Sequence, residues 1–462
     1  MSSTVAKADP AWAVKRFLER LKGDGELRAR CEARPDALER IAREEGLTVD
    51  PSALTGFWSY EASDENLEKA RSIPELQDWR ERLQSRFDYV ASMIAMPDQE
   101  TSVYSRWRRR QRARCEIELP SALNKGLPHI TTAIELSSGC SVGCWFCGIS
   151  AEKYQGSLAY DAAGEALFRG VLEALRDVVG RGLGAASLYW GTDPTDNHDY
   201  LKFAETFHAF TGCLPQTTTA RPTKDIEWTR QMLSLRRRLN APGVDRFSLL
   251  STKELHLVHE NFTAEELADV ELVYHNKGAV GDDTMRARAG KAKKRAETSK
   301  RPIALNEDQG TIACVSGFLV NLVEKRVRLI SPCAASDDWP DGYRIYAEAT
   351  FESPDHLRAL LTRWTNEVLA ADPLDLPVLG FHRAAEVGLL ETGFVLESKT
   401  KKRRIEGAPE IRFVGEVLAE RRWSRQQILE RGQERGFALL TLISILGQLR
   451  DLGMIDEDPK SR

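Results

Sequence analysis

The segment at residues 139–148 reads GCSVGCWFCG and carries three cysteines on one short loop. Cys140, Cys144 and Cys147 are separated by three and then by two residues, and Phe146 directly precedes the last of them. Three thiolates on one loop can bind three irons of a [4Fe–4S] cluster, which leaves the fourth iron without a protein ligand. Such an open iron can chelate a small molecule. The spacing therefore predicts an iron–sulfur cluster with these three cysteines as its metal ligands.

Two other roles for the cysteines fit the sequence less well. A structural zinc site normally needs four ligands, whereas Cys115 and Cys213 lie far from the loop and no histidine is close to it. A disulfide framework is disfavoured because eight cysteines in 462 residues is sparse and the N-terminus does not resemble a secretory signal. Zinc remains the second interpretation.

Composition narrows the class of protein. A length of 462 residues predicts roughly three domains, and the 42% hydrophobic content is ordinary for a soluble chain. No apolar run is long enough to cross a bilayer, and a net charge of −4 gives no global sign of nucleic-acid binding. An oxygen-sensitive cluster and unpaired thiols favour the cytoplasm. We therefore expect no membrane and no nucleic acid among the partners.

The pattern of apolar and breaker residues divides the chain into four predicted domains. Val14, Phe17, Leu18 and Leu21 follow a helical stripe near the N-terminus. The predicted domains are a helical unit at 1–60, a helical connector at 61–130, an alternating α/β region at 131–350, and a helical region at 351–462 that ends in a winged-helix-like domain.

Three local patterns carry further expectations. The basic run at 106–114 is typical of a solvated helix face. The polar, basic stretch at 277–302 predicts a mobile loop or a long insertion. Ser424 and Gln427 form a predicted capping box, and Leu439 begins the apolar face of the last strong helix.

Strands and helices alternate in the middle of the chain, which predicts a parallel sheet. The expected strands lie at 132–137, 186–190, 216–220 and 246–251, with helices around 168–179, 203–210 and 226–233 between them, and two further strands at 311–323 and 326–331. In such folds the site lies at the carboxyl ends of the parallel strands.

The cysteine spacing resembles the signature of the radical S-adenosylmethionine (SAM) superfamily. That resemblance implies a partial (β/α)6 barrel and an open iron that binds the amino and carboxylate groups of SAM. One-electron reduction, by a donor such as flavodoxin or ferredoxin, then cleaves SAM to a 5′-deoxyadenosyl radical that abstracts a hydrogen atom.

A second motif supports the same resemblance. Residues 189–194 read YWGTDP, where many radical SAM proteins have a Gly-Gly-Glu-Pro turn that holds the SAM amino group. An aspartate can accept an ammonium hydrogen bond as glutamate does, although with shorter reach. The predicted cofactor-binding residues are Phe146, Gly191, Thr192, Asp193 and Pro194, together with Arg221, Ser248 and Ser251, which could equally be structural.

Two isolated cysteines remain. Cys314 begins a predicted strand, and Cys333 follows one, within the segment at 331–344 that reads SPCAASDDWPDGYR. A free cysteine is more often a small buried hydrophobe than a reagent. Cys333, however, comes just past a strand, where catalytic groups collect, and a thiol S–H bond is weak enough to give a hydrogen atom to a carbon radical.

The motifs GCSVGCWFCG, YWGTDPTDNHDY and SPCAASDDWPDGY together resemble the radical SAM peptide epimerases of ribosomal-peptide maturation, of the polytheonamide type. The helical stretch at 13–50 resembles the leader peptides of such pathways, although a helical cap on the catalytic domain explains it equally well. The resemblance implies conversion of L- to D-residues in a ribosomal precursor peptide (leader plus core), with Cys333 as the hydrogen donor and Cys314 as the alternative.

Other functions remain open. Thioether formation usually needs additional cysteine groups for auxiliary clusters, whereas the downstream cysteines here are isolated. Methylation with cobalamin usually needs a cobalamin-binding domain, for which the sequence offers no candidate. A non-enzymatic adaptor that presents peptides, or a regulator with a structural metal, is the alternative from a different class of protein.

Overall fold

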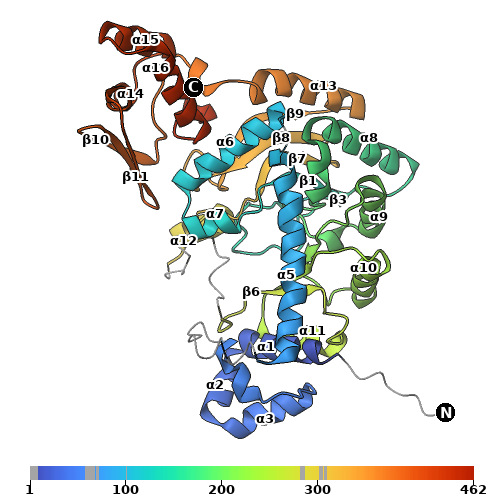
Figure 1. Cartoon of the computed structure of the whole chain (residues 1–462). Helices are drawn as coiled ribbons and strands as arrows, with labels where there is room; N and C mark the ends of the chain where they lie inside the picture. Colours follow the sequence, from blue (N-terminus) through green and yellow to red (C-terminus); the bar gives the residue numbers. More distant parts are fainter. Residues whose placement is uncertain are drawn as a thin grey trace, which may run out of the picture. The chain divides into compact units, whose positions relative to one another are not determined.

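The computed structural model describes residues 9–57, 68, 72–99, 101–280, 287–300, 305 and 310–461. It is a mixed α/β protein (Figure 1). The chain divides into a first unit, Met1–Ser92 with Asp193–Met285, and a second unit, Met93–Thr192 with Arg286–Arg462. The four predicted domains stay a prediction.

The first unit begins with the expected helices. Phe17 and Leu21 of the predicted stripe are fully buried, and Asp9 and Asp24 cap the first two helices through their side chains. The helical segments of this unit are α1 (Pro10–Gly23), α2 (Gly25–Ala33), α3 (Pro35–Glu44), η1 (Pro51–Phe57), η4 (Pro194–Asp196), α9 (Tyr200–Thr211), α10 (Ile226–Arg238), α11 (Thr252–Asn261) and most of α5 (Pro74–Ala95).

A parallel sheet forms the centre of the first unit. Its strands are β4 (Thr218–Thr219), β5 (Asp245–Leu249) and β6 (Val270–Tyr274), in that order. The predicted strands at 216–220 and 246–251 are confirmed in place, although the first is shorter than expected. Arg236 of α10 forms a buried 2.8 Å ion pair with Asp245, which ties the start of β5 to that helix.

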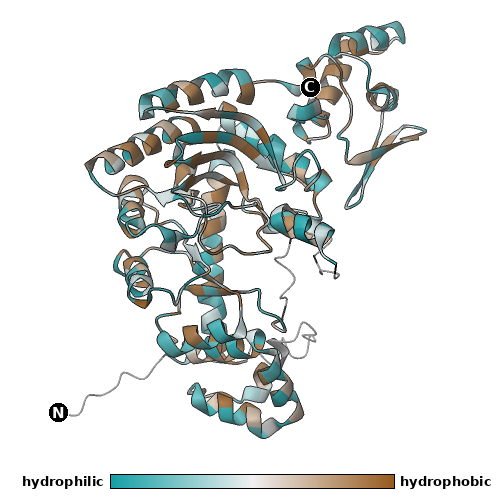
Figure 2. Ribbon diagram, turned by 180° about the vertical axis from the view of Figure 1, so that it is seen from behind, coloured by the Kyte–Doolittle hydropathy of each residue, from teal (hydrophilic) through white to brown (hydrophobic). Residues whose placement is uncertain are grey.

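A four-stranded sheet forms the centre of the second unit. Its order is β1 (Ile130–Glu135), β7 (Val315–Asn321), β8 (Arg326–Pro332) and β9 (Tyr343–Thr350). β1 and β7 run parallel, and β8 and β9 then continue antiparallel. Both β1 and β7 are buried along their whole length, and Figure 2 shows how hydrophobic these strands are. Helices α8 and α13 lie side by side in this unit (Figure 1).

The predicted strand at 186–190 is wrong. Only Ser187 pairs with β1, through a single parallel bridge to Ala133. The Ser187 hydroxyl donates to the carbonyl of Tyr189 at 3.0 Å, and such local bonds compete with extension of a strand. The described strands lie in separate sheets of two to four strands, so they show no closed barrel.

The helical segments of the second unit confirm one expectation and correct two. They are η2 (Met96–Gln99), α6 (Val103–Glu118), α7 (Ser121–Gly126), α8 (Ala162–Val179), η3 (Gly180–Ala185), α12 (Gly290–Thr298), α13 (Pro354–Trp364), η5 (Thr365–Leu369), η6 (Pro373–Asp375) and η7 (Pro459–Ser461). The helix expected around 168–179 is α8. The basic run in α6 is solvated only in part, because Arg106 and Arg109 are exposed whereas Arg108 and Arg114 are fully buried. The stretch at 277–302 contains α12 rather than only a loop, with 281–286 outside the described residues.

The last part of the second unit holds a small sheet and a helical group. Its elements are β10 (Ala385–Leu390), β11 (Gly393–Ser398), β12 (Lys402–Glu406), α14 (Pro409–Glu420), α15 (Arg425–Glu434) and α16 (Leu439–Asp451). The capping box of Ser424 and Gln427 is confirmed. Leu442 is buried on α16, but Leu439 is exposed because it starts the helix at the edge of the core. Among the described residues, no helix is long and apolar enough to span a membrane.

Candidate functional site

The cysteine loop, residues 139–148, follows β1 and the two-residue strand β2 (Ser137–Ser138), which pairs with β3 (Gly156–Ser157). Gly139 has a φ of +69°, and a Cβ there would lie 2.2 Å from the carbonyl oxygen of Lys153. The Cys140 N–H donates to the carbonyl of Glu152 at 2.8 Å. Glycine is therefore needed at 139 so that the loop can turn this tightly against 152–153.

The three thiols of the loop have a common environment. Cys140, Cys144 and Cys147 are each partly exposed and form no disulfide. The Ala151 N–H donates to the Cys147 sulfur at 3.4 Å. Among the described residues no group of three His, Cys, Asp or Glu side chains surrounds a single metal ion. In an iron–sulfur cube each thiolate binds a different iron, so three separate thiols on one loop suit that group chemically.

Helix α12 packs against the cysteine loop. The backbone N–H of Lys291 donates to the carbonyl of Cys147 at 2.9 Å, and the Lys291 ammonium donates to the carbonyl of Ala151. A Cβ on Gly290 would lie 2.6 Å from the carbonyl carbon of Gly148. The start of α12 thus supports the cysteine loop by close backbone contact. Sequence reasoning missed this role, since the composition of the stretch resembles a solvated loop.

Two aromatic residues extend this contact. The ring of Phe146 packs edge-on against Trp145, with 5.5 Å between the ring centroids. Arg295 of α12 lies 5.3 Å from the centroid of the Trp145 ring, within the range of a cation–π interaction. Trp145 thus contacts both Phe146 and α12, and the cofactor-binding role of Phe146 stays a prediction.

Glu135 is the last residue of β1, and its side chain contacts the turn at Gly191. Its carboxylate accepts the N–H of Gly191 at 2.7 Å and the amide of Asn321 at 3.1 Å. Burial raises the pKa of Glu135 to about 6, although both hydrogen bonds act in the opposite direction. A Cβ on Gly191 would lie 3.2 Å from this carboxylate and 3.7 Å from Cβ of Ala151. Sequence analysis missed Glu135, although an acid at the end of an apolar strand was a visible signal.

Asp193 belongs to the first unit and is fully engaged there. Its carboxylate accepts the N–H and hydroxyl of Thr195 at 3.0 and 2.7 Å, the hydroxyl of Thr219 at 2.9 Å and the N–H of Ala220 at 2.8 Å. Pro194 starts η4 directly after it. These bonds fix the turn to the end of β4, so the geometry gives Asp193 a structural task.

The remaining predicted cofactor-binding residues divide between the units. Gly191 and Thr192 belong to the second unit, whereas Arg221, Ser248 and Ser251 belong to the first. Ser251 caps α11, since its hydroxyl accepts the N–H of Glu254 at 3.2 Å. Ser248 lies within β5, and Arg221 follows β4.

The structure corrects the expected placement of Cys333. Because β8 runs antiparallel to β7 and β7 runs parallel to β1, the end of β8 lies at the edge of the sheet where β1 begins. The rule that catalytic groups collect at carboxyl ends holds for parallel strands, so the expectation that Cys333 lies at that edge is wrong. Its thiol is fully buried, and burial, with the nearby Glu118 charge, raises the pKa of Cys333 above its usual range.

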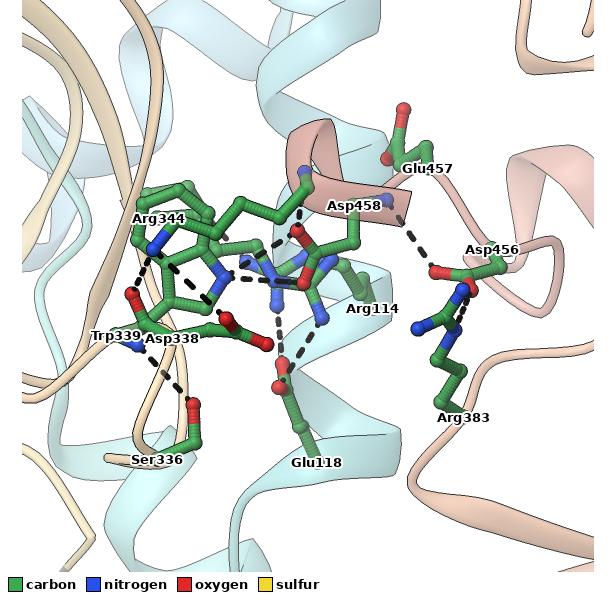
Figure 3. Close-up of polar contacts among 12 residues, drawn as sticks. Arg114, Glu118, Ser336, Asp338, Trp339, Arg344, Arg383, Asp456, Glu457 and Asp458 are labelled. Atoms are coloured by element: carbon green, nitrogen blue, oxygen red, sulfur yellow. Dashed lines mark hydrogen bonds and ion pairs between the residues drawn. The ribbon is translucent and has the colours of Figure 1, made fainter. Parts of the chain in front are cut away.

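Charged side chains fix the segment at 331–344, which we call the anchored loop (Figure 3). Arg344 donates to Glu118 at 3.2 Å and lies 3.3 Å from Asp458. The indole N–H of Trp339 donates to Asp458 at 3.0 Å. Arg114 pairs with Glu118 from the preceding turn of α6. These contacts give the anchored loop a structural role.

Cys314 directly precedes β7 and so lies at the same edge of the sheet as Cys333, but its side chain has a different environment. It is partly exposed and precedes β7, and its carbonyl accepts the N–H of Ile130 at 2.8 Å. Its side chain packs on a core cluster that also borders Ile149 and Trp190. Ile149 follows the cysteine loop and Trp190 precedes Gly191. Cys314 thus shares a hydrophobic cluster with both candidate motifs of the second unit.

Comparison with known proteins gives one strong match. The chain is 35% identical over 461 residues to "Uncharacterized protein y4wI" of Sinorhizobium fredii (strain NBRC 101917 / NGR234), covering 97% of this chain and 88% of that protein. No family model matches the chain. Among solved structures, the crystal structure of BtrN in complex with AdoMet and 2-DOIA aligns with a TM-score of 0.25 and 16% identity, over 32% of this chain and 56% of that one.

Proposed function

We propose that this chain, which belongs to the same family as protein y4wI of Sinorhizobium fredii, is a radical SAM enzyme. One observation carries the proposal: Cys140, Cys144 and Cys147, with their characteristic spacing, are partly exposed and free of disulfides on the loop after β1. The proposal includes the partial (β/α)6 barrel and a cytoplasmic location.

The chain's own residues have defined tasks in this proposal. The three cysteines would hold a [4Fe–4S] cluster, which, when bound, supplies the electron that cleaves SAM. Gly139 lets the loop turn, and the Ala151 N–H donates a hydrogen bond to the Cys147 sulfur. Helix α12 covers the end of the loop. We assign Phe146, Gly191 and Thr192 to the binding of SAM.

We assign the reaction to inversion of L-residues in a ribosomal precursor peptide. Inversion requires that one face of Cα loses a hydrogen atom and the opposite face receives one. A thiol that returns the atom breaks its S–H bond, forms the new Cα–H bond and is left as a thiyl radical. A one-electron reductant such as flavodoxin or ferredoxin, with a proton, then restores the thiol.

Cys314 is the better placed of the two candidate donors. A donor thiol must reach the substrate radical, and Cys314 is partly exposed whereas Cys333 is fully buried. Cys314 also packs against the same hydrophobic core cluster as Ile149 and Trp190, which flank the two cofactor motifs. The donor role that the sequence suggested for Cys333 therefore passes to Cys314 in our proposal, with Cys333 as the second candidate.

The test is the product formed when a ribosomal precursor peptide is incubated with the reduced protein and SAM. In ordinary water the peptide should contain D-residues at unchanged mass, and in heavy water it should carry deuterium at Cα of each inverted residue. A gain of a methyl group or a loss of hydrogens by crosslinking would instead favour methylation or thioether formation.

A further inference from the structure

Glu135 is a buried carboxylate whose polar contacts are all with uncharged donors. Within the described part of the chain, the Gly191 N–H and the Asn321 amide are the groups that its side chain contacts, at 2.7 and 3.1 Å. Glu324 and Arg328 act on this carboxylate only as charges without a hydrogen bond to it, and in opposite directions. No described cationic nitrogen forms an ion pair with it.

Two other buried acids of the protein have cationic partners, and Asp193, which has none, accepts four hydrogen bonds where Glu135 accepts two. Asp245 forms a 2.8 Å ion pair with Arg236, and Glu118 forms one with Arg344 at 3.2 Å. A buried carboxylate without a cationic partner is costly, because the charge has lost its hydration. The raised pKa of Glu135 reflects that cost. Retention of such a charge is explained if a ligand supplies the missing cation.

The position of Glu135 identifies the ligand group. A Cβ on Gly191 would touch both the Glu135 carboxylate, at 3.2 Å, and Cβ of Ala151, at 3.7 Å. The N–H of the same Ala151 donates to the Cys147 sulfur at 3.4 Å. Gly191 and Ala151 therefore lie between Glu135 and the proposed cluster ligand Cys147. In our proposed function, the cationic group that binds next to the cluster is the ammonium of SAM.

We propose that Glu135 binds the ammonium group of SAM, while Asn321 and Gly191 hold its carboxylate in place. The inference rests on the proposed function. It moves the acidic role from Asp193, whose carboxylate accepts four hydrogen bonds within the first unit, to an acid in the same unit as the cysteine loop. Asn321 also donates to the carbonyl of Ser137 at 3.1 Å, so it couples the carboxylate to the start of the loop.

The experiment compares Glu135→Gln, Glu135→Asp and a control, Glu324→Gln, after anaerobic reconstitution with iron and sulfide. Glu324 accepts a hydrogen bond from Ser138 at 2.8 Å near the same loop but has Arg326 as a cationic partner. SAM affinity is measured by calorimetry at mildly alkaline pH, and iron content and unfolding temperature are measured on the same samples. Glu135→Gln should weaken SAM binding by about tenfold or more, as expected for loss of a charged hydrogen bond.

The other two variants distinguish a loss of SAM binding from a loss of structure. Glu135→Asp, which keeps the charge, should lose less SAM affinity than Glu135→Gln, and Glu324→Gln should bind SAM like the wild type. Iron content should stay unchanged in all three. Unchanged SAM affinity in Glu135→Gln overturns the inference, and so does an affinity loss that comes with lost iron or with failure to fold, because the role is then structural. A wild-type protein that holds no cluster overturns the proposed function itself.

Discussion

The cysteine loop and the anchored loop differ in what their polar groups contact. Both belong to the second unit and both carry cysteine among small and aromatic residues. In the cysteine loop the thiols are partly exposed, and the Cys140 N–H and the Cys147 carbonyl form backbone hydrogen bonds to neighbouring segments. In the anchored loop Cys333 is buried, and Arg344 and Trp339 are tied to acids of other elements (Figure 3). The two loops thus differ in role: in our proposal the cysteine loop presents its thiols to a ligand, whereas the side chains of the anchored loop form ion pairs and hydrogen bonds within the protein.

The sharpest test of this difference replaces each of the two candidate donor cysteines in turn. Cys314→Ala should still cleave SAM but form no D-residues, because no thiol then returns a hydrogen atom. Cys333→Ala should keep epimerisation and lose on the order of 1–2 kcal/mol in the free energy of unfolding, as a small truncation in a packed core does. Chiral amino-acid analysis of the peptide and denaturant unfolding measure the two effects. Normal epimerisation by Cys314→Ala, with loss in Cys333→Ala, would reverse our assignment.

The anchored loop should respond most strongly in stability. Glu118→Gln leaves Arg344 and Arg114 without their buried partner and should cost about 3–5 kcal/mol in the free energy of unfolding. Glu348→Gln removes partly exposed ion pairs with Arg328 and Arg326 and should cost below about 1 kcal/mol. Iron bound per folded chain should not change in either variant. A cluster lost only in Glu118→Gln, at temperatures where the protein is folded, would contradict the division between the two loops.

Acid should lower the free energy of unfolding because the second unit contains buried histidines. Burial lowers the pKa of His382 to about 4 and that of His129 to about 3. Below their ordinary pKa near 6.5 the unfolded chain binds these protons and the folded chain does not, so stability falls as pH falls. Glu135, with a pKa of about 6, acts oppositely over a narrower range. We expect a net loss of roughly 3–6 kcal/mol between pH 7 and pH 4.

Denaturant unfolding across this pH range checks that slope. His129 bonds Ser316 and Asn124 through its ring nitrogens, at 2.8 and 3.2 Å. His129→Gln should flatten the dependence on pH, since it removes one of the two groups. A stability that is constant or rises toward pH 4 would mean that these histidines are not buried in the neutral form.

We expect a smaller effect, on the rate of iron release, when the contact between α12 and the cysteine loop is disturbed. Gly290→Ala places a Cβ within 2.6 Å of the Gly148 backbone at a φ of +54°, so the loop must shift. The variant should release iron faster than the wild type when challenged with a chelator. Gly447→Ala on α16, where a Cβ meets no atom within 4 Å, should stabilise by at most about 1 kcal/mol and leave iron release unchanged. Equal iron release from both variants would remove α12 from the account.

Sequence periodicity predicted the elements whose structure is decided locally. The helix at α8, the strand at β1 and the Ser424–Gln427 cap follow from apolar spacing and hydrogen-bonding residues that are neighbours in the chain. The cysteine spacing likewise needs no tertiary information, and it placed the candidate site on a loop after a buried strand.

The features that the sequence did not predict depend on contacts between residues far apart in the chain. The burial of Arg108 and Arg114 depends on distant acceptors, among them the carbonyls of His129 and Pro332. The direction of β8, which moves Cys333 to the opposite edge of the sheet, is set by its pairing with β7. Glu135 stood out only once Gly191 and Asn321 were found beside it. A single sequence does not contain these partners in readable form.

The measurement that tests the central claim most directly is the iron and acid-labile sulfide content of anaerobically reconstituted protein. The wild type and a Cys213→Ser control should bind about four of each per chain, and Cys144→Ala should lose the intact cluster together with SAM cleavage. A colourless wild type that binds zinc without sulfide, and does not release 5′-deoxyadenosine on reduction, would contradict the account.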